Sequence, residues 1–456
     1  RDRYGIKPLY YRYTNNQLYF CSEVSPLLDF NFGNKTLCRN VLDQILLLGH
    51  PIVSGKTVFR EIQSLKPGEC LIQDKSASTL LHKHNFKHYQ FPNIKENQQR
   101  LHQQLRNMIQ KSVKECTLSN RHIGLALSGG VDSSILAWEL NALGIENVTT
   151  ISVIYVGSSD GIKTLKKLEL PPGGVWEKWQ HVVVPFDEQD FKRCLCEAIE
   201  ASALPITLSS YALYFKLAKF AKEAGITVLL SGEGADEIFS GYTSYAVWSK
   251  KTKNQLHEDK LRAFYLNDEK IELWKSLLGQ ERILNVLADF KNSIKYKNET
   301  PIKVLLTHEL HYSLEPLLIR TDLALMRYSI EGRVPFLHCG IPELLNQLPV
   351  EAFFNEAETK PLLRKLYPEY SRLTKIPKTP FRITEKIYLS KEIQEWFRKT
   401  LHDNISFLDA LKIDFQPLFE KLISRDISPI DFDALFKLVC LVLWQKSHCV
   451  NLERTL

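Results

Sequence analysis

Residues 127–134, Leu-Ser-Gly-Gly-Val-Asp-Ser-Ser, have the composition of an anion-binding loop. An apolar run at 123–127 predicts a buried strand before the loop, and a helical pattern follows it, so unpaired NH groups of the helix would face a bound anion. Gly129 and Gly130 let the backbone approach phosphate oxygens, and Asp132 can hold Mg²⁺, whose charge offsets that of the phosphates. The sequence therefore predicts a polyphosphate site that also includes Leu127, Ser128, Ser133 and Ser134.

A second acidic loop, Leu-Ser-Gly-Glu-Gly-Ala-Asp-Glu-Ile-Phe-Ser-Gly-Tyr, occupies residues 230–242, directly after a strand predicted at 227–230. Strands that alternate with helices form a parallel sheet, and the carboxyl ends of parallel strands open at the same edge. We therefore expect Asp236 and Asp132 to meet at one cleft and to share the metal of a bound nucleotide, with Glu233 beside them. The predicted nucleotide-binding set also includes Ser231 and Gly232.

The loop at 127–134 lacks the Gly-Lys-Ser/Thr ending of a Walker A motif and resembles instead the loop of the ATP pyrophosphatase family. Enzymes of that family cleave ATP between its α and β phosphates and hold the departing pyrophosphate, so the resemblance implies AMP-forming activation by ATP with Mg²⁺. It also implies that the end of the next strand, at Val153 and Tyr155, lines the adenine pocket. Several enzyme types share this loop, so it indicates the reaction class and leaves the substrate open.

Residues 230–242 resemble asparagine synthetases closely. The resemblance implies that Glu233 takes part in the amide-forming step by accepting a proton from the attacking amine. It further implies that Lys360, within residues 358–364, contacts phosphate and stabilises charge in the transition state. Pro361 departs from the family pattern there, but proline is tolerated in a first helical turn.

Residues 319–337 match another asparagine-synthetase signature. We interpret its arginine, aspartate and glutamate side chains as a scaffold that braces the cleft. Arg327 and Tyr328 stand where the family usually has small or mild residues, and His338 stands where an aspartate commonly follows Phe-Leu. Residues 375–382 resemble the basic, proline-containing stretch that closes this region. The departures leave the identity of the substrate open.

The first residues, Arg-Asp-Arg-Tyr-Gly-Ile-Lys-Pro-Leu-Tyr-Tyr at 1–11, resemble the rear half of the glutaminase domain of the same enzymes. The front half of that domain, whose N-terminal cysteine attacks glutamine, is absent from this sequence, so a missing glutaminase half is a possible partner. Cys21, Cys38 and Cys70 cannot replace that cysteine, because none lies at an exposed N-terminus whose amine could assist the thiol. We therefore expect that glutamine will not serve as nitrogen donor for this stretch of chain.

The elements that must position these residues follow from hydrophobic patterning. Short strands separated by turns are predicted at 8–13, 17–21 and 69–73, and residues 82–100 are polar and basic, as in a linker. Further strands are predicted at 149–155 and 181–184, with helices between them. We predict an α/β fold, a doubly wound parallel sheet with helices on both faces like the adenine nucleotide alpha hydrolases, preceded by a partial α+β glutaminase domain of the N-terminal-nucleophile type. The expected division is a partial glutaminase domain at 1–85, a linker at 86–100 and a synthetase domain at 101–456.

Composition fits a folded protein of more than one domain: 456 residues, 44% hydrophobic, with a net charge of +7. This charge is too small to indicate a nucleic-acid partner. The nine cysteines contain no CxxC pair, and their spacing suggests neither disulfides nor a zinc site. No apolar stretch is long enough to span a bilayer and no secretory signal is present, so we expect no membrane partner and a cytoplasmic location. A homodimer is left open.

These observations predict an ATP-dependent asparagine synthetase that adenylates the side chain of aspartate and lets ammonia displace AMP. One alternative is a peptide or lactam cyclase of the same superfamily, which would activate another carboxylate and use an internal amine. An alternative of another class is a catalytically silent ATP-binding relative. The retention of Asp132, Glu233, Asp236 and Lys360 together argues against silence, because clustered carboxylates give no stability by themselves.

Overall fold

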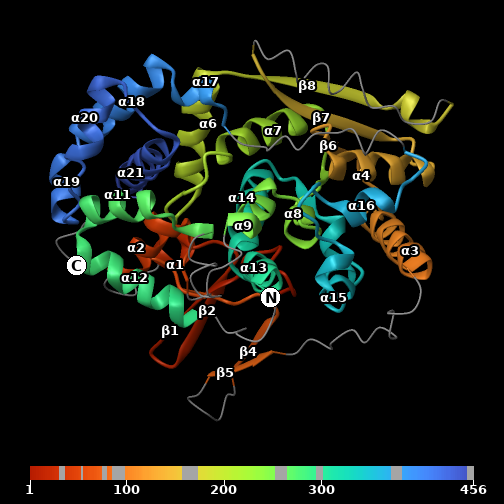
Figure 1. Cartoon of the computed structure of the whole chain (residues 1–456), viewed down its shortest axis with the longest axis horizontal. Coiled ribbons are helices and arrows are strands. Elements are labelled where there is room, and N and C mark those ends of the chain that lie inside the picture. Colours follow the sequence, from red (N-terminus) through yellow and green to blue (C-terminus); the bar gives the residue numbers. More distant parts are fainter. Residues whose placement is uncertain are drawn as a thin grey trace.

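The computed structural model describes residues 1–29, 36–52, 55–73, 80–84, 98–156, 173–251, 264–293, 301–370 and 383–448. Figure 1 shows a sheet near one side of the molecule, with β7 and β8 above α4, and a group of helices that includes α18 and α21 at the opposite side. The N-terminal strands lie below both. The predicted closing stretch at 375–382 falls outside the described residues.

The N-terminal region is a β-rich layer, as predicted. β1 (Tyr10–Thr14), β2 (Gln17–Cys21) and β3 (Gln63–Ser64) form an antiparallel sheet of order β2-β1-β3. A two-residue turn joins β1 to β2, and both of its residues, Asn15 and Asn16, have positive φ, which suits the right-handed twist of a hairpin. The other elements of the layer are α1 (Ser25–Asp29), α2 (Arg39–Leu48) and the antiparallel pair β4 (Glu69–Gln73) and β5 (Leu80–His84).

The second region is built on a parallel sheet of five strands in the order β10-β9-β6-β7-β8. Four of its strands confirm the predicted ones: β6 (Ile123–Ala126), β7 (Val148–Tyr155), β8 (Gln180–Phe186) and β9 (Val228–Leu230). The fifth, β10 (Glu331–Arg333), was not predicted. It pairs with β9 in parallel and extends the sheet on that side.

Helices pack on both faces of this sheet, which confirms the predicted fold class. α4 (Val131–Ala142) connects β6 to β7, whereas α6 (Glu188–Ala201) and α7 (Tyr211–Glu223) connect β8 to β9. The two connections run in opposite directions across the sheet, so right-handed crossovers place their helices on opposite faces. The strand order reverses between β6 and β9, and a crevice opens at the carboxyl ends of strands at such a point.

Apolar periodicity explains the helices that flank the sheet. In α3 (Gln98–Cys116), Leu101, Leu105, Ile109 and Val113 recur every four residues, and all are buried. α7 also buries an apolar face, and the chain turns into β9 through Gly225, whose φ of +76° is in the region that glycine tolerates.

Beyond the sheet the described chain is mostly helical. One long helical stretch is interrupted, since a π-helical turn (Glu309–Ser313) separates α13 (Pro301–His308) from α14 (Leu314–Met326). The turn holds the buried Glu309 carboxylate, which accepts hydrogen bonds from Tyr245 at 3.2 Å, Ser313 at 2.7 Å and Tyr265. The remaining helices are α8 (Ala235–Ile238), α9 (Thr243–Lys251), α11 (Asp268–Leu278), α12 (Gln280–Ser293), α15 (Ile341–Asn346), α16 (Pro361–Lys365), α17 (Glu385–Tyr388), α18 (Lys391–His402), α19 (Ile405–Ala410), α20 (Gln416–Ser424) and α21 (Pro429–Ser447).

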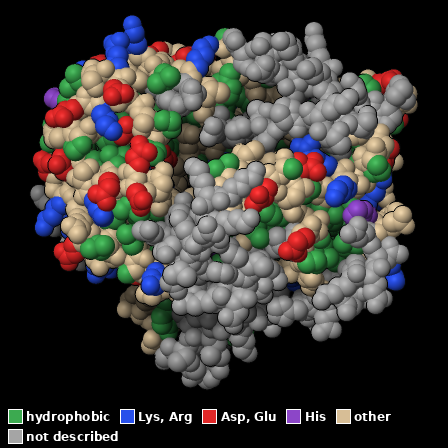
Figure 2. Space-filling view, viewed as in Figure 1, with side chains coloured by type: hydrophobic (Ala, Val, Ile, Leu, Met, Phe, Trp, Pro, Cys, Tyr) green, Lys and Arg blue, Asp and Glu red, His purple; other side chains and the backbone are tan. Residues whose placement is uncertain are grey.

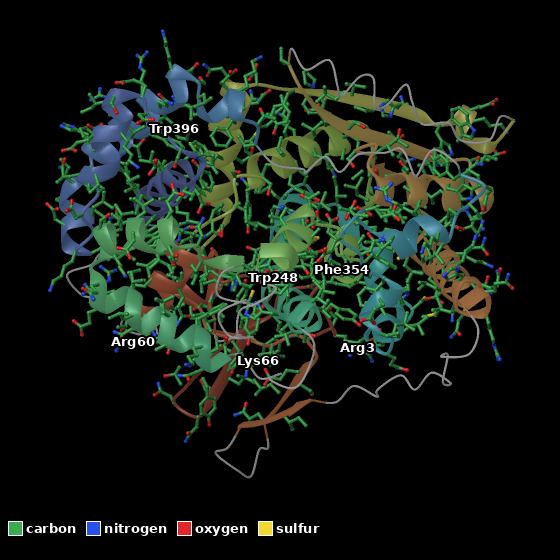
Figure 3. All side chains as sticks on the ribbon, viewed as in Figure 1. Arg3, Arg60, Lys66, Trp248, Phe354 and Trp396 are labelled. Carbon is green, nitrogen blue, oxygen red and sulfur yellow. The ribbon has the colours of Figure 1, made fainter. Side chains whose placement is uncertain are left out.

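The two regions are joined by ion pairs. Arg3, labelled in Figure 3, pairs with Glu343 of α15, and Lys7 Nζ lies 2.6 Å from Asp322 Oδ1 of α14. Most of the predicted linker at 86–100 lies outside the described residues, and its last three residues belong to α3. Acidic and basic side chains are interspersed over the described part of the face in Figure 2. Within the described ranges, no helix is long and apolar enough to cross a membrane.

Candidate active site

Two carboxylates from separate strand ends meet at the point where the strand order reverses. Asp132 is the second residue of α4, which follows β6, and Asp236 is the second residue of α8, which follows β9. Lys360 Nζ lies 2.5 Å from Asp132 Oδ2 and 2.6 Å from Asp236 Oδ1. The two carboxylates therefore lie at one edge of the sheet, as the order of strands and helices predicted.

Asp132, Asp236 and Lys360 form what we call the acidic cluster. Glycines allow the chain segments that carry these residues to approach closely. A Cβ added at Gly232 would lie 2.7 Å from Asp132 Cβ, and one added at Gly241 would overlap Asp236 Oδ1 and Lys360 Cε. Such distances are sterically forbidden, so larger residues at either position would push the carboxylates apart. The glycines of the 230–242 loop are thus required by packing around the charges.

Lys360 is held rigidly, with only 2% of its surface exposed. Its φ of +56° places it in the left-handed region, and its NH donates to Ser240 O at 3.3 Å. Pro361 then begins α16, where a fixed φ suits the first helical position. Burial alone would lower the pKa of Lys360, but the carboxylates of Asp132 and Asp236 outweigh burial and raise it, so the ammonium is charged.

The predicted phosphate loop has the expected geometry at the start of α4. Gly129 has a φ of +73°, and Gly130 is the N-cap of the helix. Ser128 Oγ lies 3.2 Å from Ser133 Oγ and accepts a hydrogen bond from Gly130 N at 3.3 Å. Leu127 is buried, and its NH and carbonyl are used within the sheet by Ile151 O and Ser152 Oγ.

Two hydroxyls beside this loop have no hydrogen-bond partner among the described residues. Ser134 Oγ and Ser231 Oγ are both buried, and Ser231 follows β9 directly. A buried hydroxyl without a partner costs free energy, and phosphate oxygens would supply the acceptor. The donors of the loop and the carboxylates opposite it therefore fit a nucleotide polyphosphate with Mg²⁺.

Glu233 lies in the same loop and is held by two side chains from helices. Arg320 Nη2 of α14 donates to Glu233 Oε1 at 2.8 Å, and the Tyr214 hydroxyl of α7 donates to the same oxygen. Arg320 Nη1 donates to Ser210 Oγ at 2.6 Å, and the guanidinium carbon lies 4.2 Å from the centroid of the Tyr214 ring. Burial raises the pKa of Tyr214, so its hydroxyl keeps the proton that it donates.

Nothing in the sequence marks Tyr214 as a site residue, because it lies among the buried residues of α7. Its spacing from Glu233 carries no signal that could have found the contact. Arg320 was interpreted as scaffold, and the structure places it directly on Glu233.

The other charged residues of the 319–337 segment contact groups outside the acidic cluster. Asp322 pairs with Lys7, and Glu331 Oε1 lies 3.0 Å from Arg333 Nε. Arg333 Nη1 also donates to the carbonyls of Cys116 and Leu118. These contacts agree with the scaffold interpretation.

The predicted adenine-binding residues lie at the end of β7. Val153 pairs with Val184 of β8, and the ring of Tyr155 meets Phe186 edge to face at 5.6 Å between centroids. Both side chains are half-buried. Lys386 Nζ donates to Val156 O at 2.9 Å, so the C-terminal helices reach this strand end. Adenine binding at Val153 and Tyr155 stays a prediction.

Comparison with known proteins agrees with this geometry. The family model described as "Asparagine synthase" matches residues 104–438, and the one described as "Glutamine amidotransferase domain" matches residues 1–87. The chain is 26% identical to asparagine synthetase [glutamine-hydrolyzing] 1 of Bacillus subtilis, over 89% of this chain and 68% of that protein. It is 25% identical to synthetase 3 of the same organism, over 90% and 69%, and 24% identical to amidase chyE of Penicillium rubens, over 54% and 38%.

Among solved structures, the NH3-dependent NAD synthetase from Campylobacter jejuni is similar at a TM-score of 0.22 and 17% identity, over 45% of this chain and 98% of that one. The family match, by contrast, covers most of the chain and includes the acidic cluster, Glu233 and the phosphate loop. The chain therefore belongs to the asparagine synthase family, and it is an ATP-dependent ligase that forms amides.

Proposed function

We propose that this chain adenylates the side-chain carboxylate of aspartate with MgATP and transfers the acyl group to ammonia, giving asparagine, AMP and pyrophosphate. The observation that carries the proposal is the meeting of Asp132, Asp236 and the Lys360 ammonium at the point where the strand order reverses. Carboxylate oxygens are ligands that Mg²⁺ prefers, and a nucleotide binds at such a point of a parallel sheet.

In the proposed site, Asp132 and Asp236 hold Mg²⁺, and the loop of Ser128, Gly129, Gly130, Ser133 and Ser134 binds the phosphates, with Ser231 and Gly232 opposite. When bound, MgATP supplies the adenylyl group, and pyrophosphate leaves as the carboxylate oxygen attacks the α phosphorus. Lys360 stabilises the charge that develops on the phosphates in that step. Val153 and Tyr155 contact adenine in this proposal, as does the backbone at Leu127.

Glu233 is the proposed base of the second step. Both hydrogen bonds that it accepts from the described part of the chain end on Oε1, which leaves Oε2 for the amine proton. As the amine nitrogen bonds to the acyl carbon, AMP leaves with the electron pair of the broken bond and Glu233 accepts the proton.

The remaining parts of the proposal rest on the family resemblance. They are the division at 1–85, 86–100 and 101–456, a cytoplasmic location, and a nitrogen supply that is free ammonia for this chain and glutamine where a complete glutaminase half is present. A homodimer stays open.

The test is incubation of the chain with aspartate, ammonium, ATP and Mg²⁺, followed by separation of asparagine, AMP and pyrophosphate. We expect all three in equal amounts, and we expect Asp132→Asn to abolish pyrophosphate release. Asp409→Asn, which changes an exposed carboxylate of α19, is the matched control and should keep full activity.

Three outcomes would contradict the proposal in different ways. Formation of ADP would refute AMP-forming activation. AMP released with another carboxylate but not with aspartate would favour the cyclase alternative. ATP binding without any AMP would favour a silent relative.

A further inference from the structure

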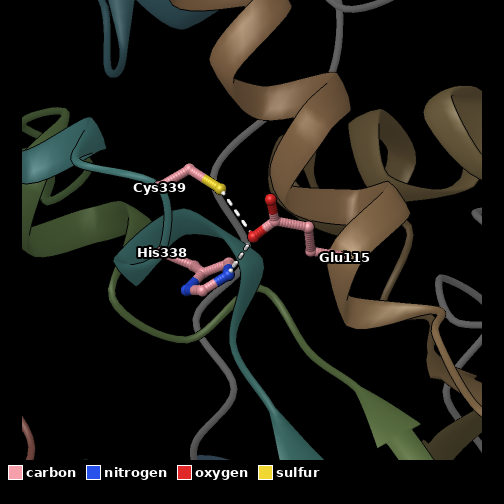
Figure 4. Close-up of side chains that lie close together, drawn as sticks. All are labelled: Glu115, His338 and Cys339. Carbon is pink, nitrogen blue, oxygen red and sulfur yellow. Dashed lines mark hydrogen bonds and ion pairs between the residues drawn. The ribbon is translucent and has the colours of Figure 1, made fainter.

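A second cluster of reactive side chains joins α3 to the loop that follows β10. Glu115 Oε2 of α3 accepts hydrogen bonds from His338 Nε2 at 2.7 Å and from Cys339 Sγ at 3.3 Å, as Figure 4 shows. Glu115 and Cys339 are half-buried, and His338 is exposed. His338 departs from the family pattern, and nothing in the proposed reaction uses it.

The three groups are ligand types that a borderline-soft divalent cation accepts together. Zn²⁺ binds carboxylate oxygen and imidazole nitrogen at about 2.0–2.2 Å and thiolate sulfur at about 2.3 Å, so ligand atoms around one ion lie within roughly 4 Å of each other. Here the oxygen, nitrogen and sulfur atoms all lie within 4.8 Å of one another. Mg²⁺ and Ca²⁺ prefer oxygen ligands and do not suit a site with sulfur and nitrogen.

Both sides of the cluster are held in place by packing. Cys339 has a φ of +55°, and Gly340 has a φ of +79°, so the chain turns sharply and brings two consecutive side chains onto one carboxylate oxygen. On the other side, Ser112 Oγ of α3 donates to Pro335 O at 2.6 Å, which ties the helix to the turn η3 (Pro335–Leu337) before His338. The ligands are therefore arranged before any ion arrives.

We propose that Glu115, His338 and Cys339 form a binding site for a divalent transition-metal ion of the Zn²⁺ class, with water in the remaining coordination position. On binding, the Sγ proton of Cys339 leaves to solvent and sulfur, nitrogen and oxygen each donate to the metal. Cysteine spacing could not predict this site, because Glu115 lies 223 residues before His338.

The proposed ion site is connected to the 230–242 loop through Leu337. Leu337 directly precedes His338, and its side chain lies so close to Gly234 that a Cβ there would meet Leu337 Cγ at 2.6 Å. An ion that fixes His338 therefore also fixes the residue that packs under the 230–242 loop. One charge opposes the ion, since Lys111 Nζ lies 3.7 Å from Glu115 Oε1, the oxygen that does not face His338.

The test is titration of the reduced chain with Zn²⁺ against a chromophoric chelator, in excess Mg²⁺ and without ATP. We expect one tight site in the wild type and at least a tenfold loss of affinity in Cys339→Ser, His338→Gln and Glu115→Gln. The matched controls are Cys21→Ser in β2 and His402→Gln in α18, which should bind Zn²⁺ as the wild type does.

Co²⁺ provides a second measurement that identifies the sulfur. The Co²⁺-loaded wild type and Cys21→Ser should show a thiolate-to-cobalt charge-transfer band, and Cys339→Ser should lack it. The proposal is overturned if the wild type binds no Zn²⁺ tightly, if Cys339→Ser binds it with less than a tenfold loss, or if the band survives in that variant. These readouts do not depend on synthetase activity.

Discussion

Lys360 and Arg1 both have buried cationic side chains, but Lys360 pairs with two carboxylates and Arg1 pairs with one. We relate this difference to ligand binding at Lys360 and to structural support at Arg1. Among the described residues, the Arg1 side chain makes one ion pair, with Glu315 Oε1 at 2.5 Å, and donates its other hydrogen bonds to Ser64 Oγ and to the carbonyls of Gly5, Lys7 and Leu65. Only 1% of the Arg1 side chain and 16% of the Glu315 side chain are exposed. The Lys360 side chain is equally buried, at 3% exposed, but it faces two carboxylates, whose side chains are 19% and 20% exposed.

The difference is the number of carboxylates and their place in the fold. At Arg1, one guanidinium pairs with one carboxylate and its other hydrogen bonds go to a hydroxyl and to backbone carbonyls, so the contacts stabilise the chain. At Lys360, two carboxylates from separate strand ends converge on one ammonium where the strand order reverses, and this arrangement fits a magnesium-bound nucleotide. A buried ion pair by itself therefore does not indicate function, whereas carboxylates that converge on a lysine at a reversal of strand order do.

The largest expected effect comes from Lys360→Met. Without the ammonium, the two carboxylates repel each other and no charge stabilises the phosphates, so pyrophosphate formation should fall about a thousandfold. Pyrophosphate release under saturating ATP is the measurement. Lys365→Met, on the exposed side of the same short helix, is the matched control. Equal rates for both variants would remove Lys360 from the proposed mechanism.

Arg1→Met should affect stability and leave the chemistry intact. The change leaves the Glu315 carboxylate without its ion pair and removes hydrogen bonds to three carbonyls, at a cost of about 3–5 kcal/mol. We expect a clear fall in the melting temperature, while the rate of pyrophosphate release per folded molecule stays near that of the wild type. Arg60→Met, at an exposed site labelled in Figure 3, should change neither quantity. A large loss in the rate of pyrophosphate release by folded Arg1→Met would mean that Arg1 contributes to the reaction as well as to stability.

His50 is a third buried ionisable residue, and it should make the free energy of unfolding depend on pH. It lines a cavity of about 630 Å³ between the N-terminal layer and α14, where its ring stacks on Tyr312 at 6.0 Å. Burial lowers the pKa of His50 to about 4, although a contact with Pro51 O opposes the shift. The unfolded chain therefore binds a proton below about pH 6.5 that the folded chain does not, and stability falls as pH falls.

Between about pH 7.5 and about pH 5, this group should contribute a loss of about 2 kcal/mol. We expect the melting temperature of His50→Gln to decrease less over that interval than the wild type does. His402→Gln, at an exposed histidine, should follow the wild type. Parallel curves for His50→Gln and wild type would contradict the assignment.

The meeting of Asp132 and Asp236 could be predicted from the sequence, because each of these residues lies close in sequence to the strand that positions it. Asp132 and Asp236 each follow a recognisable apolar strand within a few residues, and the rule that parallel strands end at one edge brings them together. β10 could not be predicted in this way, because Glu-Gly-Arg at 331–333 has no apolar alternation and becomes a strand only by pairing with β9.

Contacts between distant segments were the main source of missed features. Tyr214 belongs by its pattern to the apolar face of α7, and only the three-dimensional structure shows its hydroxyl on Glu233. The contact of Glu115 with His338 has no local signal either. The π-helical turn at 309–313 depends on tyrosines from elsewhere that donate to Glu309, which a periodicity argument does not include.

The smallest expected effect separates the two half-reactions. Tyr214→Phe removes one hydrogen bond to the Glu233 carboxylate, a contact worth about 1.5 kcal/mol, so amide formation should slow about tenfold. Adenylation does not use Glu233, so pyrophosphate exchange into ATP in the presence of aspartate should be unchanged. Tyr328→Phe removes the corresponding hydrogen bond from a tyrosine to a different carboxylate, that of Glu197, and should alter neither rate. If Tyr214→Phe slowed both half-reactions equally, the tyrosine would support the fold of the site and would not position the base.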